Sequence, residues 1–384
     1  MRFRVLAPLL VLLLAPSTGR AAVVVIGNYT DVDIAFTVAE PDAKARAHKL
    51  ASNHVSPVYV TGPADLTFTA KGRETKLRVE MYNAYIFLPD RDARAELNPI
   101  PRDPPVKIPV TLLVGDIDPR ADKQWQTELR KRFDEAADVI EKATSVRFEF
   151  AGFDTSKSDP EARNTTDLLT SLEKAVKPKE GAIVVGYSSR KIDDKVDPAI
   201  GQSRALNGRH ILMREWKPRG EPERVEALVH FLAKSLSGVG SPDPGSALRA
   251  KIGDGYALRA GAVVRLDPLN ALLLNLWADE RRRDPAVTLD TLSVVNRVRI
   301  TRLYKALLKA APGDALAVTY LCGLDRDIAK NPDPAVKNPP DRPATRVDVR
   351  DELVRGMVKA VTARAKQNAA LGTKSLKGDE LTAA

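Results

Sequence analysis

Proline sets the main division of this 384-residue chain. Six prolines occur from Pro89 to Pro109, and four of them lie in the stretch "NPIPRDPP". Because proline fixes φ and has no backbone N–H, such a stretch can form neither a helix interior nor a central strand. The sequence therefore predicts a linker at residues 91–106, with separate structural units before and after it.

Short β-type segments precede this linker. They contain β-branched runs or alternating hydrophobic residues, as in "VVVIGN", "DVDIAFTVAE", "SPVYV" and "DLTFTA". The stretch "KGRE" between two of them is typical of a hairpin turn. These patterns predict a small β-sandwich over residues 23–90.

Strands and helices alternate after the linker. A strand in "IPVTLLVGDID" is followed by helical spacing of Trp125, Leu129, Phe133 and Ile140. The order strand, helix, strand, helix, strand, strand, helix predicts an α/β or α+β domain at residues 107–280. A helical extension is expected over residues 281–384, with helical patterns from Val287 to Ala311 and in "APGDALAVTYLCGL", a proline-rich loop at 331–343 and a last helix after it.

The N-terminus has the layout of an export signal. Arg2 and Arg4 precede an apolar run, and small residues follow at Ala21 and Ala22. This predicts a secretory signal peptide at residues 1–22, with an uncleaved membrane anchor as the alternative. The mature protein is then expected to be secreted or periplasmic, without stable membrane insertion.

Composition excludes some classes of function. The net charge is +10, but the basic residues are scattered among acidic ones and only 5% of residues are aromatic. We therefore expect no nucleic-acid partner. Cys322 is the only cysteine, so the chain can form no internal disulfide and no thiolate zinc site.

One helix carries most of the unusual chemistry. In "VEALVHFLAKSLSGVGSPDPGSALR", Val225–Arg249, apolar residues form one stripe, while Glu226, His230 and Lys234 lie on the other side at i, i+4 and i+8. Spacing alone indicates a solvated face with weak charge pairing.

The continuation of this helix resembles a known signature. From His230 onward the segment is similar, without a gap, to the metzincin zinc-peptidase motif HExxHxxGxxH and its matrixin-like extension. His230 matches the first zinc ligand, "SPDP" the turn after the third ligand, and Leu248 the methionine of the Met-turn. The resemblance implies a metzincin-like fold of the α+β class, with a mixed sheet and an active-site helix. Its cleft would be lined by an edge strand in "RHILMRE", with His210, Ile211, Leu212 and Met213.

The chain departs from this motif at the positions of the general base and of the second and third zinc ligands. Phe231 stands where the general-base glutamate is expected, Lys234 and Gly240 where the second and third histidines are expected, and Ser237 where the glycine ending the helix is expected. Catalytic zinc needs about three protein ligands and a nearby carboxylate, and the cationic Lys234 would repel a metal ion. We therefore expect no zinc cofactor and no catalytic residue.

Two roles follow for the replacement residues. Phe231 is expected to plug the former cleft with apolar surface. The Lys234 charge could substitute for the metal by holding nearby carboxylate or carbonyl groups; the alternative is an ordinary surface lysine.

The sequence therefore predicts an exported, inactive pseudo-peptidase that binds a peptide or protein in its cleft by strand addition. One alternative is an active zinc metallopeptidase with ligands among His210, His230, Glu223 and Glu226. A second alternative is a structural envelope protein whose β-sandwich does the work.

Overall fold

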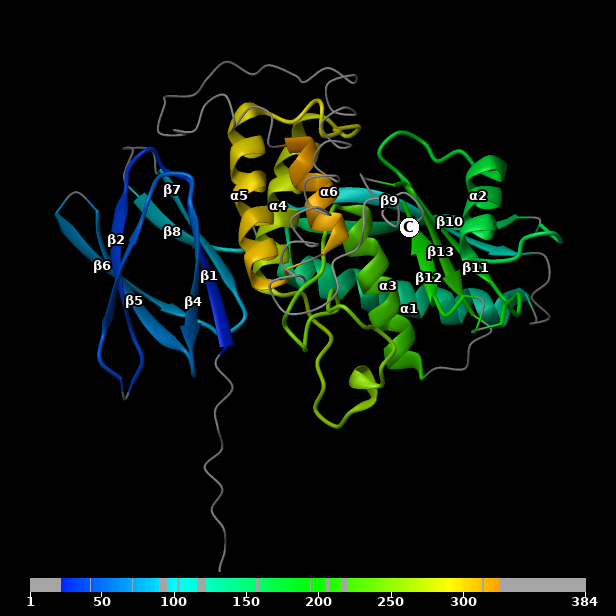
Figure 1. The fold of residues 1–384 in the computed structure, drawn as a ribbon, viewed down its shortest axis with the longest axis horizontal. Helices are drawn as coiled ribbons and strands as arrows, with labels where there is room; N and C mark the ends of the chain where they lie inside the picture. Colours follow the sequence, from blue (N-terminus) through cyan, green and yellow to red (C-terminus); the bar gives the residue numbers. More distant parts are fainter. Residues whose placement is uncertain are drawn as a thin grey trace, which may run out of the picture.

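The computed structural model describes residues 22–324, apart from residues 42, 71, 90–94, 102–103, 116–121, 157–158, 194, 196, 205–207, 216–219 and 313. The predicted signal peptide up to residue 21, the proline-rich loop at 331–343 and the last predicted helix lie outside the described residues. Within that range, no helix has the length and apolar character needed to cross a membrane. Figure 1 shows a β-sandwich on one side, an α/β unit on the other, and three helices between them.

The N-terminal unit is a sandwich of two four-stranded sheets, with strand orders β4-β1-β7-β8 and β3-β2-β5-β6. Its strands β1 to β7 are Ala22–Asn28, Ile34–Ala39, Arg46–Leu50, Val55–Val60, Ala64–Ala70, Arg73–Val79 and Ala84–Pro89. Residues on the two inner faces form one core that includes Ile26, Phe36, Leu66, Phe68 and Phe87. The alternation read from the sequence thus marks the faces that meet.

Strand β8, Ala95–Pro99, lies inside the predicted linker and extends the sandwich. It pairs antiparallel with β7 and occupies the edge of its sheet. Proline is tolerated at an edge because no neighbouring strand needs its missing N–H. The proline pattern excluded a central strand here, but it did not exclude this edge strand.

The second unit is built on a five-stranded sheet of order β10-β9-β11-β13-β12. The strands are β9 Val106–Gly115, β10 Val146–Ser156, β11 Ile183–Ser188, β12 Gly201–Ser203 and β13 His210–Arg214. Only β12 runs antiparallel to its neighbour, so the sheet is mixed. The predicted α+β class is confirmed.

The position predicted for His210, Ile211, Leu212 and Met213 is wrong. These residues form β13, which lies between β11 and β12, so β12 is the edge strand. Strand β12 has only three residues, too few to show an alternating pattern in the sequence.

Three helices cover this sheet. Helices α1, Asp122–Ala143, and α3, Glu221–Ser235, share one core with one face of the sheet, and α2, Thr165–Ala175, covers the other face. Asn164 caps α2, since its side chain accepts a hydrogen bond from the Asp167 N–H at 2.8 Å. Helix α3 lies between α1 and the β12 end of the sheet, since it contacts α1, β12 and β13.

Helices α4, Pro268–Arg283, α5, Val294–Ala310, and α6, Ala315–Leu324, lie between the two units (Figure 1). Helix α4 is buried on both sides. Leu274 and Ala278 join the core of the α/β unit, whereas Leu272 and Trp277 join a second core that contains Val25 and Ile86 of the sandwich. The two units are therefore joined through α4, which contributes side chains to both hydrophobic cores.

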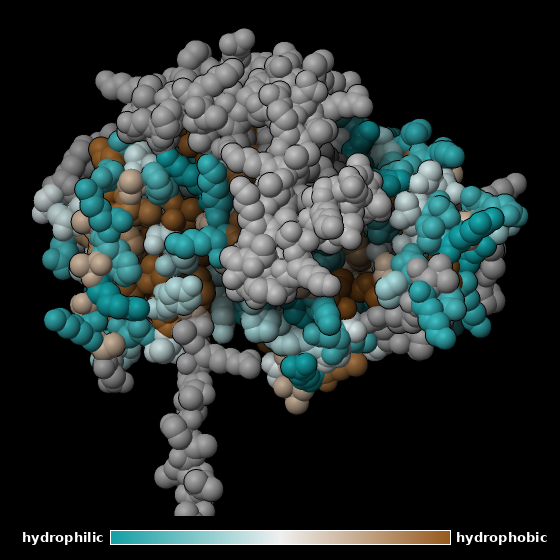
Figure 2. Space-filling view, viewed as in Figure 1, coloured by the Kyte–Doolittle hydropathy of each residue, from teal (hydrophilic) through white to brown (hydrophobic). Residues whose placement is uncertain are grey.

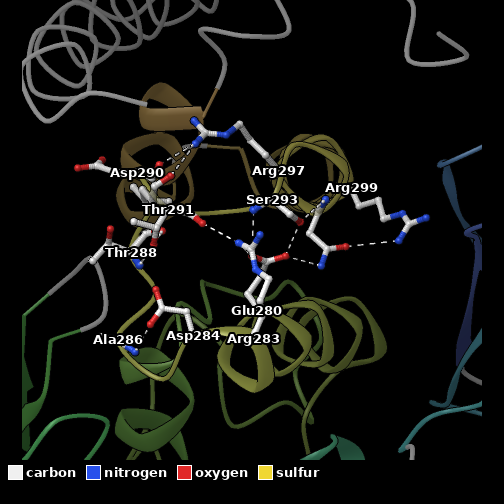
Figure 3. A network of polar contacts seen from close by, with 12 residues as sticks. Glu280, Arg283, Asp284, Ala286, Thr288, Asp290, Thr291, Ser293, Arg297 and Arg299 are labelled. Atoms are coloured by element: carbon white, nitrogen blue, oxygen red, sulfur yellow. Dashed lines mark hydrogen bonds and ion pairs between the residues drawn. The ribbon is translucent and has the colours of Figure 1, made fainter. Parts of the chain in front are cut away.

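A polar network fixes the connection from α4 to α5 (Figure 3). The buried Glu280 carboxylate accepts hydrogen bonds from the Ser293 N–H at 2.9 Å, from Asn296 Nδ2 at 2.7 Å and from Arg283 Nη2 at 2.7 Å. Ser293 caps α5, which begins at Val294, so residues 287–293 form turns and not the predicted start of the helix. The hydroxyl cap fixes the start of the helix at a point that the apolar spacing alone did not reveal.

Two arginines of α5 reach the sandwich. Arg299 donates to Asn53 Oδ1 at 2.8 Å and to the Tyr29 carbonyl at 3.1 Å. Arg302 donates to the Ser52 carbonyl at 3.0 Å and to the Asn53 carbonyl at 2.5 Å. These bonds add orientation to the hydrophobic contact between the sandwich and the helices.

Candidate functional site

The candidate site is centred on α3. Every residue from Val225 to Ala233 is buried, including Glu226 and His230. The solvated face indicated by spacing alone is therefore wrong, because the polar side of α3 is covered by other parts of the chain.

The end of α3 explains the glycine of the resembled motif. The Gly238 N–H donates to the Ala233 carbonyl at 2.9 Å and the Ser237 N–H donates to the Lys234 carbonyl at 3.0 Å. This is a Schellman cap, which needs a left-handed residue. Ser237 supplies it with φ of 70°, a conformation that glycine adopts at lower cost.

His230 is held by the turn that matches the Met-turn. Its Nδ1 lies 2.8 Å from the Ala247 carbonyl oxygen, so Nδ1 carries the proton and donates. Burial and the neighbouring charge of Lys234 lower the pKa of His230 to about 3. The ring is therefore neutral near pH 7. Leu248, in the Met-turn position, is completely buried in the core of the α/β unit.

The second-ligand position faces a small pocket. Lys234 and Phe231 line a cavity of about 160 Å³ together with Gln202 and Ser203 of β12, Arg204 just after this strand, and Leu316 and Tyr320 of α6. Burial lowers the pKa of Lys234, and the negative charge of Asp314 partly offsets this effect. Lys234 is thus a half-buried cation under the influence of a carboxylate, not a lysine extended into bulk solvent. Phe231 is 7% exposed and forms part of the hydrophobic core next to the pocket.

The third-ligand position is occupied by a carboxylate from another part of the chain. Asp314 Oδ2 accepts a hydrogen bond from the Gly240 N–H at 3.0 Å. A Cβ atom added to Gly240 would lie 2.2 Å from the same oxygen. There is consequently no room for any side chain at Gly240 while Asp314 keeps this position.

Asp314 also begins α6. Its Oδ1 accepts from the Ala317 N–H at 2.7 Å, the geometry of an N-terminal cap. One carboxylate thus ties α6 to the loop after α3. Asp314 is not among the predicted site residues, although an aspartate before the predicted helix in "APGDALAV" is a capping signal. Nothing in the sequence links it to Gly240.

A buried ion pair lies one helical turn before His230. Arg249 binds Glu226 through two hydrogen bonds, of 2.5 Å and 3.0 Å, and binds Asp254 at 2.7 Å. Glu223 accepts from the Gly255 N–H at 3.1 Å. Both glutamates are therefore engaged in holding the loop after the Met-turn position, a role that the sequence analysis did not assign to Arg249.

Zinc does not fit the residues at this position. His230 offers one imidazole, but the second position is an ammonium and the third has no space for a side chain. His210, the other histidine considered, lies at the start of β13 with its Nε2 2.8 Å from the Val176 carbonyl oxygen. Over the described part of the chain, no group of three or more His, Cys, Asp or Glu residues is placed to hold a metal ion.

No family model and no curated protein match the sequence. Among solved structures, similarity is found to archaemetzincin from Methanopyrus kandleri, with a TM-score of 0.36, 14% identity, and coverage of 47% of this chain and 99% of that chain. Similarity is also found to archaemetzincin from Archaeoglobus fulgidus in complex with malonate, with a TM-score of 0.27, 14% identity, and coverage of 37% of this chain and 85% of that chain. For metalloproteinase-II from Bacteroides fragilis the TM-score is 0.31 and the identity 9%, with coverage of 72% of this chain and 98% of that chain. At TM-scores below 0.5, these similarities carry no conclusion about activity.

Proposed function

We propose that this protein is an exported metzincin-like pseudo-peptidase that binds extended polypeptide and does not hydrolyse it. The observation that carries the proposal is the pair of replacements after His230: Lys234 in place of a metal ligand, and Gly240 closed off by Asp314. A metzincin-like arrangement of helix and turn is kept, while the chemistry of metal-assisted hydrolysis has no residues to support it.

Loss of hydrolysis follows from what each position can do. Zinc-assisted hydrolysis needs a metal-bound water and a base that takes its proton. Phe231 has no acid-base group, and the nearest buried carboxylate on the same helix, Glu226, is paired with Arg249. The residues present therefore supply neither the ligands nor the base.

Binding of polypeptide is supported by the edge strand β12. Within the described residues, β12 pairs with β13 on one side and with no strand on the other. The Arg214 N–H donates to the Ile200 carbonyl at 3.0 Å, so by the alternation of an antiparallel pair the backbone groups of Gly201 and Ser203 point to the open side. An extended peptide can add there as a further strand.

Export is part of the same proposal. The leader at residues 1–22 has the charge and hydropathy pattern of a secretory signal. The protein would then work in the periplasm or outside the cell. Expression of the full chain with its own leader, followed by N-terminal sequencing of the exported product, tests this step; finding the intact leader on membrane-bound protein would contradict it.

Metal analysis and peptide binding together test the main proposal. We expect far less than one equivalent of zinc in the purified protein, no cleavage of a fluorogenic peptide library, and binding of the same library. Ser203→Pro, which removes an outward N–H, should weaken binding, whereas Lys131→Met, at an exposed lysine of α1 that does not line the pocket, is the control and should bind as the wild type does. One tightly bound zinc together with cleavage would overturn the proposal.

A further inference from the structure

The pocket beside Lys234 has the features of a binding site for a specific chemical group. It lies where β12, α3 and α6 meet, and its volume of about 160 Å³ corresponds to a few water molecules. A group of this size is a carboxylate with one small side chain. A large aromatic residue would need more space than the pocket offers.

The charge of the pocket comes from Lys234. Arg204 lines the same pocket, but its guanidinium is paired with Glu173 through bonds of 3.0 Å and 3.1 Å. The described residues offer Lys234 no hydrogen bond or ion pair; the only interaction with a carboxylate is the longer-range one with Asp314. Lys234 is therefore a half-buried ammonium that faces a cavity, and within the described part of the chain no carboxylate is in direct contact with it.

Asp314 does not supply that counter-charge by contact. Its two carboxylate oxygens accept from the backbone N–H groups of Gly240 and Ala317, at 3.0 Å and 2.7 Å. Both carboxylate oxygens of Glu226 accept hydrogen bonds from the Arg249 guanidinium, so Glu226 does not supply the counter-charge either. A half-buried ammonium is costly unless it is paired, so the pocket favours an anionic guest.

The edge strand indicates which anion fits. Gln202 and Ser203 of β12 line the pocket, and the backbone groups of Ser203 point to the open side of the strand. A peptide added along β12 is thus led into the cavity, where its chain has to end because the space is small. Capture of a peptide terminus by backbone groups and a charge is a known form of recognition.

We infer that this pocket binds the α-carboxylate at the C-terminus of a peptide, with the Lys234 ammonium as its partner in place of a metal ion. The peptide ends in a small residue, and its preceding residues pair with β12. This inference rests on the proposed peptide-binding function and names the part of the peptide that is recognised.

The test compares one peptide library in two chemical forms. Hexapeptides carrying a fluorophore at the N-terminus are made as free acids and as C-terminal amides, and fluorescence anisotropy measures binding to the full-length protein. We expect the acids to bind about tenfold more tightly than the amides, which is about 1.4 kcal/mol. Lys234→Met, which keeps the length of the side chain, should remove the difference, and Lys234→Arg should keep part of it.

Lys131→Met is the matched control, since Lys131 is an exposed lysine of α1 remote from the pocket residues. It should bind as the wild type does. Equal binding of acids and amides by the wild-type protein would overturn the carboxylate inference and leave the proposed peptide binding intact. If neither form binds, both proposals fail. Binding of amides with an internal aspartate or glutamate, at the strength of the acids, would also overturn the inference of a terminal carboxylate.

Discussion

The backbone N–H of Gly240 donates a 3.0 Å hydrogen bond to Oδ2 of Asp314, a residue 74 positions later in the chain. This bond places the start of α6 at the position where a third metal ligand would project in the motif that the α3 segment resembles. The corresponding site in this chain thus differs from the motif at two points that depend on each other: residue 240 has no side chain, and the Asp314 carboxylate occupies the space that a side chain there would take.

The first prediction concerns this space. Gly240→Ala should lower the free energy of unfolding by about 1–3 kcal/mol, because the new methyl group overlaps Asp314. In the background of Asp314→Ala, the same change should cost much less. Urea unfolding of the four proteins of this double-mutant cycle gives the coupling energy, and additive costs would contradict the predicted contact.

The second prediction concerns recovery of a metal site. Phe231→Glu combined with Lys234→His restores a base and a second histidine, but the protein should still bind less than one equivalent of zinc, as measured by elemental analysis after dialysis. The reason is the lack of a third ligand at Gly240, which Asp314 excludes. Tight zinc binding by this double variant would show that the third position is not required.

A third prediction concerns the buried pair of Glu226 and Arg249. Glu226→Gln should destabilise the protein by about 3–5 kcal/mol, because it leaves the Arg249 guanidinium without one of its charged partners in a buried place. Asp134→Asn, which breaks an exposed pair with Arg130 on α1, is the control and should cost no more than about 0.5 kcal/mol. Thermal unfolding of both variants measures the difference between their losses of stability. Equal losses would contradict the prediction and would indicate that Arg249 is hydrated.

The fourth prediction is the pH dependence that His230 confers. The pKa of His230 is about 3 in the folded protein and about 6.5 when unfolded, so the unfolded state binds the proton first. The stability from this residue is fully present above pH 6.5 and falls towards pH 3, by about 1.4 kcal/mol for each pH unit. Urea unfolding between pH 4 and 7 measures the slope, which His230→Asn should reduce. An imidazole NMR signal of His230 that titrates near pH 6.5 would contradict this.

A fifth prediction concerns the attachment of the sandwich. Arg302→Met removes two hydrogen bonds to carbonyl groups of the sandwich while keeping an apolar stem, so protease cleavage in the segment after β8 should become faster. Arg259→Met, on the exposed loop after η1 (Tyr256–Leu258), is the control. Leu258 of η1 is 54% exposed and Val263 of the following loop is 65% exposed. Figure 2 shows that this face of the molecule is otherwise a mixture of hydrophilic and hydrophobic colours. Equal cleavage rates in wild type and Arg302→Met would show that the hydrophobic contact alone holds the sandwich.

Sequence patterns predicted the elements whose periodicity is strong and missed those whose surroundings hide it. Helix α1 and strands β9 to β11 follow the expected alternation or helical spacing. Helix α4 was not predicted, because it is buried on two sides and its residues, "PLNALLLNLWADERRR", show no clear apolar stripe. The three residues of β12 are too few for any pattern.

Only those features of the site that lie within one continuous stretch of sequence were predictable. The positions of His230, Lys234 and Leu248 followed from a gapless resemblance over one helix and turn, and the structure places His230 against that turn through the Ala247 carbonyl. Asp314, which accepts from Gly240, and the α6 residues that line the pocket beside Lys234, Leu316 and Tyr320, lie far along the chain. Contacts of this range depend on the tertiary fold, and a single sequence contains no record of them.

Helix α4 has a consequence for how such a chain can change over time. Leu274 and Ala278 complete one core, and Leu272 and Trp277 complete the other. A recombination event that exchanged the sandwich for a different module would leave half of this helix facing water, unless the new module brought a matching apolar surface. Exchange of the sandwich and the α/β unit together would avoid this cost, and a substitution on α4 affects the packing of both neighbours at once.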